Sequence, residues 1–271
     1  MNDLTLFQSF VLGALQGFAE FLPVSSSAHL ALAPWAFGWP EPGLAFDVAL
    51  HVGTLVALLW YFRLEWVALL RAAQAIVRTR RVDTVEQRRV VLLVIATVPG
   101  AIAGLVLEKQ AETIFRAPSL TAMALIAMGG LLWIVDARSR SSRTLSGMAM
   151  ADALLIGCAQ AFALIPGVSR SGATITAGRA LGFDRSSAAV FSFMMSMPII
   201  AAAAVLKVPK ALHASGVTAS LLVGVATAAL SGWLAIAILL RFVQTRGFGV
   251  FVVYRFVLGG AVLALVAARA A

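Results

Sequence analysis

Residues 163–177 read ALIPGVSRSGATITA, a polar, glycine-containing stretch inside a chain that is otherwise strongly apolar. Arg170 lies at its centre, between Ser169 and Ser171, and a helix-like run starts at Ala173. Because proline ends one helix and serine caps the next, the stretch predicts a sharp turn between two helices. An arginine at such a turn indicates an anion-binding site.

A related pattern occurs near the N-terminus. Residues 13–25 read GALQGFAEFLPVS and residues 157–169 read GCAQAFALIPGVS, so Gly, Gln, Phe, Pro and Ser recur in order, with a one-residue offset at the proline. Short, proline-interrupted apolar segments in matching positions are typical of re-entrant hairpins in inverted repeats. We therefore predict two re-entrant helical hairpins, over residues 4–39 and 148–183.

The composition is that of an integral membrane protein. Of the 271 residues 61% are hydrophobic and 12% are charged, and the mean hydropathy is +0.94, which lies outside the range of soluble domains. The apolar runs are continuous rather than alternating, so the spans are helical. Six runs are long enough to cross a bilayer: 45–62, 90–107, 120–135, 188–206, 217–240 and 248–268. The predicted fold is all-α, with six transmembrane helices and two re-entrant hairpins.

Three spans separate the two hairpins, so the second half of the chain must be inverted relative to the first. We predict a single transmembrane domain over residues 1–271. Residues 1–146 form its first inverted repeat and residues 147–271 its second.

The positive charges give the orientation. If the Arg-rich loop 63–89 is cytoplasmic, most of the 21 lysines and arginines fall on that side, as the positive-inside rule requires. Both termini are then outside, and the first hairpin enters from outside and the second from the cytoplasm. The lysines and arginines behind the net charge of +9 therefore flank membrane spans, which argues against a nucleic-acid partner. Cys158 is the only cysteine, so no intramolecular disulfide is expected.

Inverted repeats bring the two hairpin tips together near the middle of the bilayer. The helices that follow the tips then direct their N-termini, with unpaired N–H groups, at a shared space. The Arg170 guanidinium suits a phosphate or diphosphate in that space. The alternative for each of the five serines near the tips is helix capping; they are Ser25, Ser26, Ser27, Ser169 and Ser171.

Glu20 follows an almost uncharged run, and an isolated charge in a membrane costs at least about 2.5 kcal/mol. The carboxylate must be paired, protonated or metal-bound. Gln16 lies one helical turn earlier, on the same face. Amide and carboxylate oxygens suit Mg or Ca, with water and phosphate as further ligands. The alternative is an ion pair between Glu20 and Arg170 without metal.

Three further side chains need an explanation. His29 is within one turn of Ser26, where it could act as a general base or donate to a phosphate oxygen, although a packing role is the alternative. His51 lies in a continuous span without the serines that accompany His29, and we interpret it as structural. Arg255, in the run FVVYRFVL, either binds an anion or extends to the membrane edge.

The two tip sequences resemble a known family. Gln16 and Glu20, with FLPVSSSAH ending at His29, and PGVSRSGAT over residues 166–174 are similar to the two signature motifs of the bacterial undecaprenyl-diphosphate phosphatases linked to bacitracin resistance. The span that contains Tyr254 and Arg255 is also similar, and the resemblance extends over essentially the full length. It implies six spans with two re-entrant hairpins. It also implies removal of the terminal phosphate of undecaprenyl diphosphate on the outer side of the inner membrane, which recycles the lipid carrier for peptidoglycan synthesis.

The resemblance also implies residue roles. Glu20 with Gln16 would hold a divalent cation, Mg or Ca, or water, and Ser26 and His29 would lie at the reacting phosphorus. The residues implied to bind the diphosphate are Ser169, Arg170, Thr174 and Arg255, beside Ser25 and Ser171. Two positions depart from the family pattern: Gln16 where many members have Glu, and Ala28 where Gly is common.

We expect in-line phosphoryl transfer, in which charge stabilisation dominates the rate enhancement. The nucleophile is either Ser26, activated by His29, or a water activated by Glu20 or His29. The expected partners are a polyprenyl diphosphate and membrane lipids, and a homodimer is left open. The competing interpretation is a transporter or lipid flippase, since inverted repeats with broken helices are typical of transporters.

Overall fold

The computed structural model describes residues 4–112 and 117–270. Within these ranges the secondary structure is helical, apart from one isolated bridge between Arg143 and Phe183. The α-helices, in chain order, are α1 (Leu6–Phe21), α2 (Ser26–Phe37), α3 (Gly43–Tyr61), α4 (Arg63–Thr79), α5 (Val85–Glu112), α6 (Pro118–Arg138), α7 (Met150–Ala161), α8 (Arg170–Ala180), α9 (Arg185–Ser215), α10 (Ala219–Phe242) and α11 (Gly249–Ala270). Two short 3-10 helices, η2 (Leu145–Gly147) and η3 (Phe162–Leu164), flank α7.

Two pairs of short helices form the predicted hairpins. α1 packs against α2, and α7, extended by η3, packs against α8. A capping box at Thr5 starts α1, and Ser25 and Ser169 cap α2 and α8. The segments with Pro23 and Pro166 separate the arms, because proline cannot continue a helix. The turns therefore fall where the sequence predicted them.

The predicted spans correspond to α3, α5, α6, α9, α10 and α11. Five of them are long and apolar enough to cross a membrane, and α3 becomes the sixth when it is taken with α4, from which it is bent by 85°. α4 is amphipathic: Trp66 and Leu69 are buried, whereas Arg71 and Arg78 are exposed. The chain is a multi-pass helical membrane protein.

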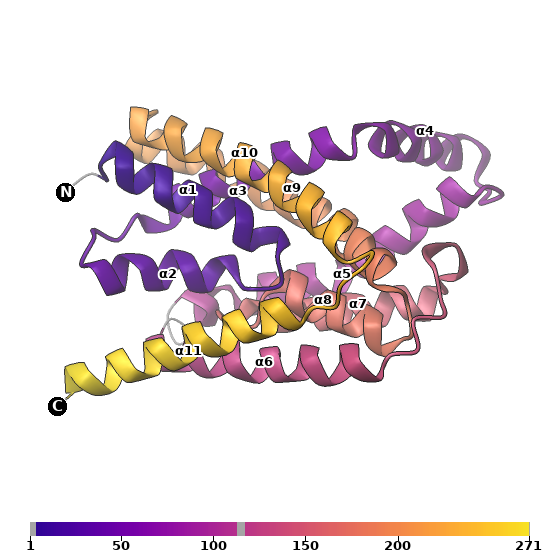
Figure 1. The fold of residues 1–271 in the computed structure, drawn as a ribbon. Coiled ribbons are helices and arrows are strands. Elements are labelled where there is room, and N and C mark those ends of the chain that lie inside the picture. The colour runs from indigo at the N-terminus through magenta and orange to yellow at the C-terminus, as the bar shows by residue number, and fades with distance from the viewer. Residues whose placement is uncertain (1–3, 113–116, 271) are drawn as a thin grey trace.

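The ends of the bundle match the charge pattern. Both chain termini lie at one end of the bundle, and α4 lies at the other (Figure 1). The Arg-rich segment after α3 is thus at the end opposite the termini, as the orientation predicted from the charges requires.

Close helix contacts hold the first arms of the hairpins in the bundle. α1 packs on α10, and α7 packs on α5. A Cβ atom on Gly13 would lie 2.4 Å from the Gly224 carbonyl oxygen, and one on Gly157 would lie 2.4 Å from the Ala96 carbonyl oxygen. Only glycine permits these approaches. The two glycines occupy the same position in the two related segments, so each makes the same kind of contact.

Ion pairs fix the base of the second hairpin. The Asp136 carboxylate of α6 accepts from Arg179 of α8 at 2.8 Å and from Arg185 of α9 at 2.9 Å, and it also accepts from the backbone N–H of Phe248. Arg143 donates to Asp152 at the start of α7. Arg179, which the charge pattern placed in a cytoplasmic region, is fully buried. Asp136 thus joins α8 and α9 to the end of α6 and to the residue that precedes α11.

Candidate active site

The capping serines of the two hairpin tips share a positive φ. Ser25 and Ser169 precede α2 and α8, with φ of 76° and 73°. Each hydroxyl accepts from an N–H in the first turn of its helix, that of Ala28 at 3.4 Å and that of Gly172 at 3.1 Å. A positive φ is uncommon for a residue other than glycine and clusters at functional sites. The matching conformation places Ser26 and Arg170 at the same position, as the first residue of each second helix.

The tips are bonded directly to each other. The Gly167 N–H of the second tip donates to the Ser25 hydroxyl at 3.1 Å, and the Ser171 hydroxyl donates to the Leu22 carbonyl of the first tip at 3.1 Å. Residues that are more than 140 positions apart in the sequence therefore form one structure. This confirms that the two tips meet.

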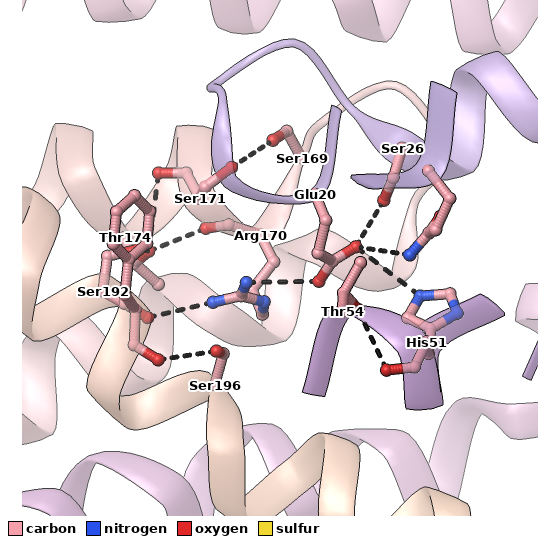
Figure 2. Close-up of polar contacts among 12 residues, drawn as sticks. Glu20, Ser26, His51, Thr54, Ser169, Arg170, Ser171, Thr174, Ser192 and Ser196 are labelled. Atoms are coloured by element: carbon pink, nitrogen blue, oxygen red, sulfur yellow. Dashed lines mark hydrogen bonds and ion pairs between the residues drawn. The ribbon is translucent and has the colours of Figure 1, made fainter. Parts of the chain in front are cut away.

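Glu20 lies at the centre of the contact and is only 6% exposed. Its Oε2 accepts from the Ser26 hydroxyl at 2.7 Å and from the Gln16 amide at 3.1 Å, and its Oε1 accepts from Arg170 at 3.2 Å. Figure 2 shows Ser26 and Arg170 on opposite sides of this carboxylate. The ion pair between Glu20 and Arg170, which the sequence left as the alternative to a metal site, is present. The carboxylate bridges the candidate nucleophile and the candidate phosphate ligand.

Arg170 is held by α9 as well as by Glu20. Its Nη1 donates to the Ser192 carbonyl at 3.0 Å, and its Nε is buried without a hydrogen-bond partner. The Thr174 hydroxyl donates to the Arg170 carbonyl at 2.8 Å and lies 2.7 Å from the Ser192 hydroxyl. Figure 2 shows this group beside the guanidinium. The sequence did not single out Ser192, which is fully buried in an apolar span.

The other predicted phosphate-binding hydroxyls are engaged within the tips. The Ser169 and Ser171 hydroxyls are 3.1 Å apart, and the Ser25 hydroxyl is 3.2 Å from that of Ser27. Thr174 is fully buried. The capping alternative holds for Ser25 and Ser169, while the role of these hydroxyls as diphosphate ligands stays a prediction.

His29 lies at the first tip but is turned toward α11. Its Nδ1–H donates to the Ser25 carbonyl at 2.6 Å, so that in the neutral ring Nε2 accepts from the Tyr254 hydroxyl, also at 2.6 Å. The two rings are stacked, with centroids 5.6 Å apart. Both ring nitrogens are thus bonded away from Glu20. Activation of Ser26 by His29 stays a prediction, and it requires the bond to Tyr254 to open.

His51 is the histidine that lies near Glu20. Its Nε2 is 3.6 Å from Glu20 Oε2, and its Nδ1–H donates to the Asp47 carbonyl at 2.7 Å. The sequence interpretation of His51 as a structural residue missed this contact. The available signal was a titratable side chain in a long apolar run, which marks a functional site by default.

Arg255 is fully buried on α11, and its partners are carbonyl groups. Its guanidinium donates to the carbonyl oxygens of Leu125 at 3.0 Å, Pro23 at 2.9 Å, Gly167 at 2.5 Å and Val168 at 3.0 Å. The alternative that it extends to the membrane edge is wrong, because the side chain turns inward. Its predicted contact with the diphosphate stays a prediction.

A cavity of about 960 Å³ opens beside the tips. Its walls come mainly from α2, α3, α5 and α9, and its residues include Ser27, Leu30, Trp35, His51, Leu164 and Ile199. Glu41 and Lys207 also line it. A mostly apolar wall with polar groups near the tips suits a molecule with a long apolar tail and a polar end.

Oxygen donors for a cation are few. Gln16 Oε1 is buried without a hydrogen-bond partner, beside the Glu20 carboxylate. Among residues 4–112 and 117–270, no group of three or more His, Cys, Asp or Glu side chains could hold a metal ion. The tips therefore fit a hard cation only when water and phosphate supply most of its ligands.

Fold and site together define a multi-pass membrane protein in which a buried carboxylate, an arginine and a serine hydroxyl meet between two helix N-termini. The chain belongs to a family described as bacitracin resistance protein BacA, whose model matches residues 9–261. A protein named undecaprenyl-diphosphatase from Gemmatimonas aurantiaca is 56% identical over 266 residues, which cover 98% of this chain and 100% of the relative. Relatives of the same name from Pelotomaculum thermopropionicum and Geobacter sulfurreducens are each 51% identical, over 98% and 96% of this chain and 98% and 97% of their own lengths.

Proposed function

We propose that the chain hydrolyses undecaprenyl diphosphate to undecaprenyl phosphate and inorganic phosphate at the Glu20–Ser26–Arg170 centre. The observation that carries this proposal is the Glu20 carboxylate, which accepts from Ser26 on one oxygen and from Arg170 on the other. Family membership and relatives named undecaprenyl-diphosphatase support the substrate. The chain is thus a phosphatase of a lipid diphosphate, in keeping with carrier recycling and bacitracin resistance.

Ser26 is the proposed nucleophile. Its proton passes to Glu20 Oε2, 2.7 Å away, as the serine oxygen bonds to the terminal phosphorus and the bond to the bridging oxygen breaks. Undecaprenyl phosphate leaves with the electron pair of that bond. Water then attacks the phosphoserine, releases inorganic phosphate and restores the serine. Arg170 and the N-termini of α2 and α8 stabilise the charge that develops on the phosphoryl oxygens.

The alternative nucleophile is a water that Glu20 activates. Two displacements retain the configuration at phosphorus, whereas direct attack by water inverts it. Hydrolysis of a substrate with a chiral terminal phosphate therefore separates the two routes. We expect retention, with a phosphoserine trapped at Ser26; inversion would assign the attack to water.

We also propose a divalent cation, Mg or Ca, as the cofactor. Gln16 Oε1 and the Glu20 carboxylate would hold it, and the diphosphate and water would complete its ligands. When bound, such an ion neutralises part of the diphosphate charge. We expect chelation to lower phosphate release and either ion to restore it, and Gln16→Leu to raise the ion concentration needed for half-maximal rate. A rate unaffected by exhaustive chelation would exclude this part of the proposal.

The deciding assay is phosphate release from undecaprenyl diphosphate by the purified protein in detergent. We expect release by the unmodified chain and its loss in Glu20→Gln. Glu65→Gln, a carboxylate change in α4 at the other end of the bundle, is the matched control and should keep full activity. No release by the unmodified chain would refute the proposed activity.

The proposed location is the bacterial inner membrane, with the cavity open to the periplasm or cell exterior. The Arg-rich region lies at the end of the bundle opposite the termini, and positive charge favours the cytoplasm. We expect a membrane-impermeant thiol reagent, added to intact spheroplasts, to label the Glu41→Cys variant but not the Glu65→Cys variant. The reverse labelling would show that the orientation is opposite to the proposed one. A homodimer stays a prediction.

Lipid translocation is a second candidate activity. We propose that residues 1–146 and 147–271 are inverted repeats, supported by the matching contacts of Gly13 and Gly157 and the matching φ of Ser25 and Ser169. Such repeats are common in transporters. Translocation of a fluorescent polyprenyl phosphate by Glu20→Gln protein in liposomes would reveal transport independent of hydrolysis. Equal rates in protein-free liposomes would exclude it.

A further inference from the structure

We infer that Arg255 is a positioning residue, which sets the spacing between the two hairpin tips and does not bind the diphosphate. The inference rests on the proposed function, because the spacing matters through Ser26 and Arg170. It starts from the four carbonyl groups to which the buried guanidinium donates.

Two of these carbonyls are equivalent. Pro23 and Gly167 hold the same position in the related segments 13–25 and 157–169, and Arg255 donates to one with Nη1 and to the other with Nη2. One rigid guanidinium thus joins the same backbone position in both tips. Its fork geometry fixes the distance between its nitrogens, so it also fixes the distance between the two carbonyls.

The joined carbonyls lie close to the reacting groups along the chain. Ser26 follows Pro23 by three residues, and Arg170 follows Gly167 by three residues. A shift of either carbonyl therefore moves the first residue of α2 or α8. Glu20 bonds both Ser26 and Arg170. These two bonds therefore depend on the distance between the Pro23 and Gly167 carbonyls.

Small residues around Arg255 leave room for this arrangement. A Cβ atom on Gly172, in the first turn of α8, would lie 2.9 Å from Arg255 Nη1. A Cβ atom on Gly129 of α6 would lie 3.3 Å from the Cβ of Arg255. The surroundings thus accommodate a guanidinium directed at the tips.

The partners of Arg255 differ from those of Arg170. Arg170 donates to a carboxylate and keeps a buried Nε without a hydrogen-bond partner, so it has capacity for an anion. Arg255 has four hydrogen bonds to carbonyls, and a guanidinium offers five N–H groups in all. One N–H of Nη1 is left over, so a bidentate contact with a phosphate would require Arg255 to release at least one of these carbonyls.

The test compares Arg255→Lys with Arg170→Lys. The measurements are kcat and KM for undecaprenyl diphosphate, the inhibition constant of inorganic diphosphate, and Tm. A lysine offers its donors from one nitrogen and cannot reproduce the fork. We expect Arg255→Lys to lower kcat by about 100-fold, the cost of a displacement of about 1 Å, with KM and the inhibition constant within about 3-fold. For Arg170→Lys we expect the inhibition constant of diphosphate to rise by about 10-fold or more.

Gly172→Ala is the second variant, because it keeps Arg255 and displaces its Nη1. We expect kcat to fall by about 10-fold with an unchanged inhibition constant, as a smaller displacement predicts. An inhibition constant that rises in Arg255→Lys as much as in Arg170→Lys would overturn the inference, and so would unchanged kcat in both Arg255→Lys and Gly172→Ala. Should Arg255→Lys fail to fold, Gly172→Ala decides alone. An inactive unmodified chain would refute the proposed function instead.

Discussion

The two hairpin tips share the conformation of their capping serines but differ in chemistry. Ser25 and Ser169 share an unusual φ and the same capping bond. The first tip carries Glu20 and Ser26 where the second carries Leu164 and Arg170. The capping serines, which set the geometry of the tips, are thus alike. The side chains that carry charge differ between the tips. A single polar centre arises because each tip supplies what the other lacks.

The hairpins also differ at their bases. Buried ion pairs of Asp136 and a pair between Arg143 and Asp152 hold the second hairpin to its neighbours. At the corresponding end of the first hairpin, Arg269 donates hydrogen bonds to the carbonyls of Trp35 and Ala36. The arginine tip thus has the firmer base, whereas both tips border the cavity.

The largest effect is expected from removing Glu20, the carboxylate that the first tip has and the second tip lacks. Glu20→Gln deletes the proposed base of Ser26 and the partner of Arg170, and general-base catalysis alone contributes about 10²–10⁴-fold. We expect kcat for phosphate release to fall by about 10³-fold or more. Glu65→Gln, the same loss of a carboxylate in α4 at the other end of the bundle, should stay within about 3-fold. Similar losses in both variants would show that the effect does not depend on the carboxylate at the tips.

The bases of the two hairpins can be compared through the thermal stability of variants. Asp136→Asn leaves the fully buried Arg179 without its carboxylate, and breaking a buried ion pair costs about 3–5 kcal/mol. We expect a clear fall in Tm, with kcat per folded molecule unchanged. Arg269→Gln, at the base of the first hairpin, should change Tm little, because its bonds are exposed. A larger loss from Arg269→Gln would reverse the assignment of the firmer base.

The two capping serines provide a finer comparison. Ser25 accepts from Gly167 of the other tip as well as from its own helix, whereas Ser169 caps α8 and contacts Ser171. A lost cap costs about 1 kcal/mol, and a buried N–H left unsatisfied adds about 1–3 kcal/mol. We therefore expect Ser25→Ala to lower the free energy of unfolding more than Ser169→Ala. Equal losses in chemical denaturation would mean that the bond between the tips contributes nothing.

The smallest expected effect concerns Tyr254. Tyr254→Phe removes the hydroxyl bonded to His29 but keeps the ring stack. If this bond only orients His29, kcat should fall by no more than about 3-fold, since a neutral hydrogen bond contributes about 1 kcal/mol. A gain in kcat would favour His29 as a base that Tyr254 restrains. Steady-state phosphate release, with Tyr61→Phe as control, makes the distinction.

Much of the fold could be predicted because it depends on local pattern. Continuous apolar runs placed the spans, and proline followed by serine placed both turns within a few residues of Ser25 and Ser169. The repeat of glycine and proline signals predicted that the tips meet. Each of these properties is carried by residues close together in the sequence.

The site could be predicted only in part. The ion pair of Glu20 and Arg170 was foreseen as an alternative to a metal site, because an isolated charge in an apolar span is costly. The approach of His51 to Glu20 and the bond of Ser192 to Arg170 were not, because they depend on how α3 and α9 rotate against the tips. Arg255 was expected to need an anion, but converging backbone carbonyls also stabilise a buried cation. No sequence pattern within α11 reveals these carbonyls, which belong to other segments.

The length of α1 has a consequence for access. This helix has 16 residues and carries Glu20 near its end, so at about 1.5 Å per residue the carboxylate lies roughly 20 Å from the level at which the helix begins. On the proposed function and orientation, in which α1 begins among the lipid headgroups, the diphosphate must descend by a similar distance to reach Glu20, in a bilayer whose hydrocarbon core is about 30 Å thick. At that depth dissolved salt screens the ion pair of Glu20 and Arg170 only weakly.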